Sequence, residues 1–212
     1  TRLDQPFASV TVGERGYLRA VYGESREIGQ GLTLLSAAER LNNNGPWTVP
    51  EGMRKTNAQF ILSSGSPREG WTTSFSAYTA SWHSTDQVPQ RLLDAGTYQG
   101  LPFGRFDSLD PSDGANTSRF SLSGDWRSSS ALEMTRVEWY AIKYDLNLFS
   151  NFTYSLNRSV DQFAQTDNRI VLGGKAFKTW LTDLGSDRFL QNTLGVQLRQ
   201  DRIRVGLYDA TG

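Results

Sequence analysis

The residues best suited to binding another molecule lie together in one long irregular stretch, 84–117. It contains Arg91 and Arg105, whose planar guanidinium groups suit carboxylates or phosphates. It also contains Tyr98 and Phe103, whose rings offer apolar contact at little entropic cost. Loops beyond about 12–15 residues are usually functional or disordered. The stretch therefore predicts a ligand-binding loop, and the alternative is an ordered cover whose Asp and Gly residues only make turns.

Other candidate site residues precede this loop. His83 is the only imidazole and has Asp86 three residues later, but one His with one Asp is a weak signal for a metal. Trp47 and Trp82 are candidates for stacking on a sugar, or for an aromatic girdle at a membrane surface. No Ser lies in a nucleophile elbow and no complete P-loop is present. We expect no catalytic residues, no metal, no cofactor and no enzyme activity.

Composition excludes several other classes of protein. The 212 residues include 22 basic and 22 acidic side chains, so no excess of positive charge favours nucleic acid as a partner. The chain has no Cys, which excludes disulfides and thiolate sites. Mean hydropathy is −0.49 and no apolar run reaches 18 residues, which excludes a transmembrane helix but not membrane-spanning strands.

Apolar and polar residues alternate in several segments, as in strands with one apolar face. In 118–127, Phe120, Leu122, Gly124 and Trp126 alternate with polar residues that would suit a wet lumen. The pattern recurs in 8–13, 57–63, 168–177 and 191–199, and β-forming residues are frequent in 17–27, 31–41, 71–83 and 132–145. These segments predict nine strands, with 203–209 as an optional tenth, most of them at or slightly above the roughly 9–11 residues that cross a bilayer.

The expected connections differ in length between the two ends of the sheet. The three longest, 42–53, 84–117 and 146–167, share one end if neighbouring strands are antiparallel. Outer-membrane barrels have this asymmetry, with short periplasmic turns and long outer loops. A soluble antiparallel sheet also explains the alternation but does not require the asymmetry. We therefore expect an all-β, antiparallel, up-and-down transmembrane β-barrel, of which nine or ten strands form only an arc.

Several blocks of sequence resemble TonB-dependent outer-membrane receptors. The most distinctive is Trp-His-Ser-Thr-Asp-Gln-Val-Pro-Gln-Arg at 82–91. It is followed in the same order by Gly-Arg-Phe at 104–106 and Asp-Pro-Ser-Asp-Gly at 110–114. Further similar blocks, at 46–55, 144–154, 194–199 and 203–207, extend the resemblance over essentially the whole chain.

The resemblance implies a 22-stranded barrel with an N-terminal plug in its lumen. Residues 1–212 are then the N-terminal portion of the barrel, without the plug, the TonB box and the C-terminal strands. The implied function is TonB-dependent uptake of a scarce solute, such as an iron chelate (siderophore), haem, cobalamin, another metal or an oligosaccharide. The implied partners are that small-molecule ligand, the TonB complex and the lipid of a Gram-negative cell outer membrane. The alternative is a soluble β-sandwich that binds carbohydrate through exposed Trp and Tyr.

Overall fold

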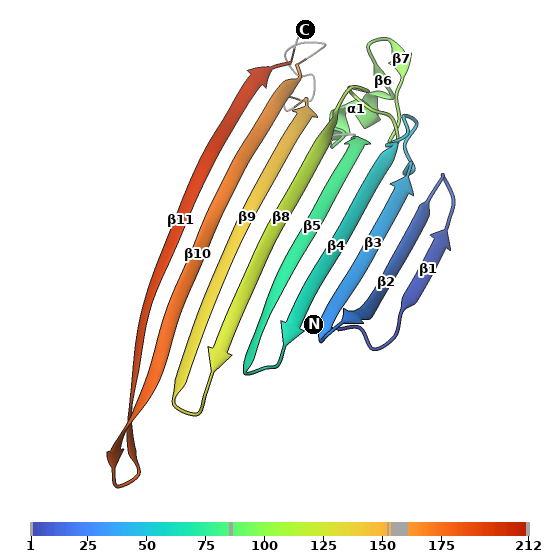
Figure 1. The fold of residues 1–212 in the computed structure, drawn as a ribbon. Helices are drawn as coiled ribbons and strands as arrows, with labels where there is room; N and C mark the ends of the chain where they lie inside the picture. Colours follow the sequence, from blue (N-terminus) through green and yellow to red (C-terminus); the bar gives the residue numbers. More distant parts are fainter. Residues whose placement is uncertain (1, 85–86, 152, 154–160, 211–212) are drawn as a thin grey trace.

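A computed structural model describes residues 2–84, 87–151, 153 and 161–210, and it is all-β apart from one short helix. Nine strands form a single antiparallel sheet in the order β1-β2-β3-β4-β5-β8-β9-β10-β11, so that each pairs with the strand before it in the sheet (Figure 1). β1 and β11 are the two edges, and the sheet is not closed into a barrel. The expectation of an all-β antiparallel fold is confirmed.

The strands of this sheet lengthen along the chain. They are β1 (Phe7–Val12), β2 (Leu18–Gly29), β3 (Leu32–Asn43), β4 (Met53–Gly65), β5 (Glu69–His83), β8 (Gly114–Ser129), β9 (Glu133–Ser150), β10 (Phe163–Gly185) and β11 (Arg188–Asp209). The connection between β5 and β8 holds α1 (Gln90–Ala95) and a small hairpin of β6 (Thr97–Tyr98) and β7 (Leu101–Pro102).

Two expectations about the strands are corrected. The segments 191–199 and 203–209 are not separate strands, because β11 runs through both for 22 residues. No Gly or Pro separates them, and the pairing with β10 continues unbroken from Arg199 to Ile203. Strands at or slightly above about 9–11 residues were expected, and β8 to β11 are longer than that, with 16 to 23 residues.

The connections have the expected asymmetry. The three long links, which follow β3, β5 and β9, all start from one end of the sheet, where Figure 1 labels α1, β6 and β7. Links 30–31, 66–68, 130–132 and 186–187 lie at the other end and are short. In one of the two shortest, 186–187, Ser186 and Asp187 both have positive φ, as a two-residue hairpin turn requires. We call these the long-loop end and the short-turn end.

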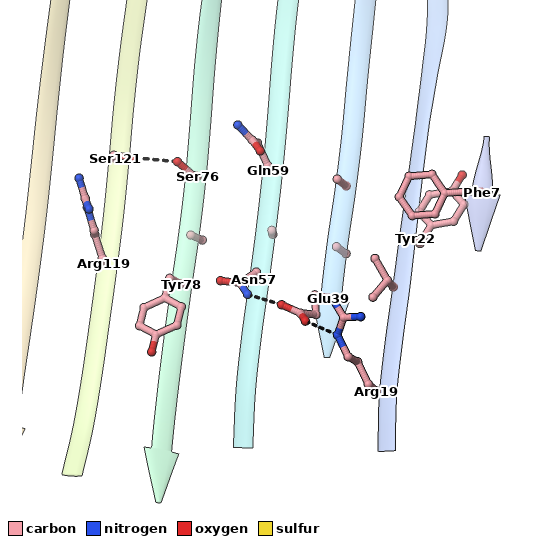
Figure 2. A pocket seen from close by; sticks show the side chains of 15 residues that line it. Phe7, Arg19, Tyr22, Glu39, Asn57, Gln59, Ser76, Tyr78, Arg119 and Ser121 are labelled. Atoms are coloured by element: carbon pink, nitrogen blue, oxygen red, sulfur yellow. Dashed lines mark hydrogen bonds and ion pairs between the residues drawn. The ribbon is translucent and has the colours of Figure 1, made fainter. Parts of the chain in front are cut away.

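Register divides the sheet into two chemically different faces, since directly paired residues point to the same side. One row joins Phe60, Phe75 and Leu122, and we call this side the apolar face. A row on the opposite side joins Glu39, Asn57, Tyr78 and Arg119, and we call this side the polar face; Figure 2 shows part of it. The faces therefore match the sequence prediction for 118–127.

Little of the apolar face is covered. Leu122, in the middle of β8, is 41 % exposed although it lies in an apolar row. Within the described residues the only other sheet is the β6–β7 hairpin, so no second layer packs against this face. No helix among the described residues has the length and apolar character needed to cross a membrane.

Candidate functional site in the long loops and on the polar face

The longest loop folds into a compact, ordered unit and is not an irregular connection. α1 ends at Gly96, which adopts the left-handed conformation and donates its N–H to the carbonyl oxygens of Leu92 and Leu93. Gln99 and Gly100 both have positive φ and form the turn between β6 and β7. These glycines explain why the loop turns twice within a few residues.

Two of the expected ligand-binding aromatics pack against each other in this unit. The rings of Tyr98 and Phe103 meet edge to face with centroids 5.5 Å apart. The N–H of Phe103 donates to the carbonyl of Gly96 at 2.9 Å, and Phe103 is only 8 % exposed. Phe103 is thus an internal anchor of the loop, whereas Tyr98 is half-buried and keeps some surface for contact with another molecule.

The other candidates near this loop are spread over its surface. Arg91 in α1 and Arg105 after β7 are both exposed. His83 ends β5 with an exposed side chain, and its N–H donates to the carbonyl of Glu51 at 2.7 Å. Trp82 and His83, which are neighbours in the chain, both line a cleft of about 480 Å³. Asp86 lies outside the described residues.

Trp47 fastens the preceding long link, 44–52, to the longest loop. Its ring lies 6.1 Å from that of Phe106, and its Nε1 donates to Glu51 Oε1 at 2.8 Å. The N–H of Thr48 donates to the carbonyl of Phe106 at 2.9 Å. Hydrogen bonds from the Thr48 side chain and from the N–H of Gly104 lower the pKa of Asp107. Trp47 therefore connects the 44–52 link to the longest loop, and its side chain is half-buried.

A buried polar bridge fastens the third long link, and sequence reasoning missed it. The side-chain amide of Gln162 donates to Ser112 Oγ and to Asp113 Oδ1, both at 2.9 Å. Asp113 is 1 % exposed and Gln162 is 7 % exposed. The partners are about fifty positions apart in the chain, so nothing in a single sequence pairs them. All three long links are consequently joined at one end of the sheet.

The polar face carries a cluster of hydrogen-bonded charges centred on Glu39 in β3 (Figure 2). Its carboxylate accepts hydrogen bonds from Arg19 Nε at 2.7 Å and Asn57 Nδ2 at 2.6 Å. Lys55 Nζ lies 3.2 Å away. These side chains come from β2, β3 and β4. Arg19, Glu39 and Asn57 line a shallow cleft of about 510 Å³ that reaches Arg119 in β8. The sequence alone does not show that these side chains meet, because their contact depends on the pairing register of the three strands.

The same face is lined with ion pairs farther along the sheet. Arg169 pairs with Asp167, Lys175 Nζ lies 2.9 Å from Glu138, and Arg199 Nε lies 2.9 Å from Asp201. Exposed pairs of this kind add little stability, about 0–1 kcal/mol each. Their number suits a surface in contact with water better than a dry core. The polar face therefore provides hydrogen-bond donors and acceptors for a polar partner.

Within the described residues, no group of three or more His, Cys, Asp or Glu side chains is placed to hold a metal ion. Comparison of the chain with models of protein families, with curated proteins and with solved structures found no match.

Proposed function

We propose that this sheet is part of the wall of a TonB-dependent outer-membrane receptor that takes up a scarce solute. The solute is an iron chelate, haem, cobalamin, another metal or an oligosaccharide. One observation carries the proposal, and it is the course of the apolar residues across the apolar face. They form what we call the apolar belt, which consists of Leu18, Ala20 and Tyr22 in β2, Ala58, Phe60 and Leu62 in β4, Phe75 and Ala77 in β5, Phe120, Leu122 and Trp126 in β8, Ile170 and Leu172 in β10, and Leu194, Val196 and Leu198 in β11.

The belt crosses the strands obliquely. The paired row that contains Ala20 in β2 reaches Ser118 in β8 and Arg204 in β11. In β8 the middle of the belt, Leu122, lies four residues from Ser118 towards the short-turn end. In β11 the middle of the belt is Val196, eight residues from Arg204 in the same direction. Averaged over the seven steps from β2 to β11, the belt thus shifts by about one residue for every strand. The shift occurs between β2 and β4 and between β10 and β11, and the belt is level from β4 to β10.

This slope matches strands that are tilted in a bilayer. Eight residues correspond to about 26 Å along β11, and the seven steps from β2 to β11 correspond to about 34 Å across the sheet. The belt therefore makes an angle of roughly 38° with the paired rows, and strands of membrane barrels tilt by about 35–45°. A flat hydrocarbon layer that cuts tilted strands produces such a belt. A sandwich needs an apolar opposing sheet, which the described residues do not include.

Residues outside the belt support the same arrangement. Above it, near the long-loop end, the apolar side chains change sides: Leu146 and Val205 lie on the polar face, while Asp145 and Arg204 lie on the other. An outer surface that is apolar within a membrane becomes polar where it rises into water. Apolar residues on the inner side at that height suit a protein segment packed inside the wall, as a plugged barrel has.

Closure is part of the proposal. β1 and β11 each have one edge without a partner strand in the described sheet. Bilayer hydrocarbon does not tolerate open edges, so we infer that further strands of the receptor complete the barrel. Loops at the long-loop end then face the outside and capture the solute, and the polar face lines the interior.

Orientation is tested by labelling single cysteines in the full-length receptor, since this chain contributes no Cys of its own. Ser123→Cys on the polar face is expected to react rapidly with a small water-soluble thiol reagent. Leu122→Cys, its neighbour on the apolar face, is expected to resist that reagent and to react with a lipid-soluble maleimide. Equal reactivity of both sites towards the water-soluble reagent would contradict a membrane wall.

Transport is tested separately with radiolabelled ferric chelates, haem and cobalamin. Cells that lack the receptor are expected to lose uptake of one of these solutes. Cells with the receptor but without TonB are expected to bind that solute and fail to internalise it. Uptake that proceeds normally without TonB would overturn the proposed mechanism.

A further inference from the structure

Basic side chains gather on the apolar face at the edge of the belt nearest the long loops. Lys143 in β9 and Arg202 in β11 are both paired with Ile170 of β10 between them, and therefore lie in one row. Arg204 follows two residues later on the same side of β11. Within the described part of the chain, neither Arg202 nor Arg204 has an ion-pair partner, whereas Lys143 Nζ lies 3.6 Å from Asp145.

The opposite edge of the belt is different. Towards the short-turn end, Arg26 lies 3.6 Å from Glu24, and Lys178 Nζ lies 3.0 Å from Glu133. These cations are neutralised by carboxylates of the same face. At the long-loop edge, by contrast, Arg202 and Arg204 have no such carboxylate partner within the described residues.

An apolar groove begins beside Lys143. It has a volume of about 230 Å³, and its lining includes Phe75, Phe120, Ala141 and Ile170 together with Lys143 itself. The groove is almost wholly apolar and lies within the belt. A hydrocarbon chain fits such a groove, and the adjacent cations complement a phosphate at its end.

We propose that this edge is a specific site for a phosphorylated lipid. Arg202 and Arg204 hold the phosphate, Lys143 beside Asp145 borders the site, and the groove over Ala141 takes one acyl chain. The inference rests on the proposed function, because it requires the apolar face to contact a bilayer. The proposed function requires only that the apolar face contacts acyl chains, and this inference adds one specifically bound lipid at a defined position.

The test uses the full-length receptor, purified in detergent after reconstitution into vesicles of phosphatidylcholine with or without phosphatidylglycerol. Native mass spectrometry then counts the phosphatidylglycerol molecules that the protein retains. The variant Arg202→Gln with Arg204→Gln is compared with Arg26→Gln plus Lys178→Gln, which removes the same charge from the short-turn edge of the same face. Since a basic residue near a lipid surface contributes about 1 kcal/mol, the first variant is expected to bind the lipid at least about tenfold more weakly. The control pair is expected to match the wild type.

A third variant, Ala141→Phe, fills the groove without changing charge. It is expected to reduce retention of phosphatidylglycerol, while inorganic phosphate added as a competitor displaces little of the lipid. Equal retention by the two charge variants would overturn the site, and so would complete displacement by inorganic phosphate together with no effect of Ala141→Phe. Insertion into both kinds of vesicle without lipid preference would overturn this inference alone. Failure to insert into either would overturn the proposed function and this inference with it.

Discussion

At the scale of single residues, glycines inside the strands make room for aromatic rings of the adjacent strand. Gly124 pairs with Trp139, and a Cβ atom added to it would lie 2.7 Å from the indole. Gly173 stands in the same relation to Tyr140, at 2.4 Å from the phenol ring. Such pairs fix the orientation of the ring and compensate for the weak packing of glycine in a strand.

Gly124→Ala is therefore expected to displace Trp139 from its position across β8. Overpacking of this kind costs about 1–3 kcal/mol, with the lower end expected because the indole lies on an exposed face. Gly104→Ala is the control, since the nearest atom to its added Cβ is 3.7 Å away. The measurements are urea unfolding and the tryptophan emission maximum of the receptor. An unchanged emission maximum in Gly124→Ala would contradict the packing of Trp139 on Gly124.

Leu122→Arg tests the proposal that the apolar face of β8 meets hydrocarbon. Leu122 lies at the middle of the belt, and an Arg on the lipid side near the bilayer midplane costs about 2–4 kcal/mol. Ser123→Arg places the same side chain on the polar face, among existing ion pairs, and is expected to cost much less. Both values are obtained from unfolding of the receptor in lipid vesicles. Similar costs for the two substitutions would contradict the assignment of the faces.

Alternation in the sequence was sufficient to assign these faces but not the partners on them. Phe120, Leu122 and Trp126 alternate with polar residues, and a period of two fixes which of them share a side. The contact between Gly124 and Trp139 depends on how β8 and β9 align, which a single sequence does not specify. The Glu39 cluster is hidden for the same reason, because its members come from three strands.

At the scale of elements, the long loops owe their shape to contacts that bridge distant parts of the chain. Glycine signals at Gly96 and Gly100 explain the local turns of the longest loop. Its length indicated a functional loop, but the internal packing of Phe103 was not readable from composition. The continuous strand β11 was missed because Gln200, Asp201 and Arg202 interrupt its apolar residues, although charged side chains on either face are compatible with a strand.

Gln162→Leu is expected to loosen the third long link from the longest loop. The substitution removes both amide donors, to Ser112 and to Asp113, and leaves buried polar atoms with fewer hydrogen bonds, at a cost of about 1–3 kcal/mol. Limited proteolysis of the proposed full-length receptor in membranes is expected to cut 84–113 faster, while the sheet remains intact. Gln90→Leu is the control, because Gln90 bonds only to exposed Asp94 within α1. Equal cleavage rates in the two variants would argue against the bridge.

Deletion of residues 92–105 tests whether the longest loop captures the solute. The deletion removes most of α1 and the β6–β7 hairpin but leaves the contact of Thr48 with Phe106. Surface loops tolerate shortening because the entropy of loop closure changes slowly with length. The receptor is expected to remain folded in the membrane and to lose binding of its solute by intact cells. Binding at the wild-type affinity would reduce the loop to a cover.

At the scale of the whole molecule, the slope of the apolar belt is the feature on which the proposed membrane wall rests. Neither composition nor alternation revealed it, because each strand alone shows only which residues are apolar. The slope becomes visible when the strands are aligned by their pairing, from Ala20 in β2 to Val196 in β11. A barrel with tilted strands requires this offset, and a sheet whose strands stand upright in the layer does not.

The slope predicts the depth of individual residues in the bilayer. Spin labels on single cysteines at Ala20, Leu122 and Val196 are expected to lie at the same depth, although these positions belong to three different paired rows. A label at Arg204, which shares the row of Ala20, is expected to lie about 20 Å nearer the outer surface, given about 3.3 Å per residue and the tilt. Power-saturation measurements with oxygen and a water-soluble nickel complex report depth directly. If Ala20 and Arg204 instead lie at one depth and Val196 lies far below them, the strands stand upright and the belt does not mark a membrane.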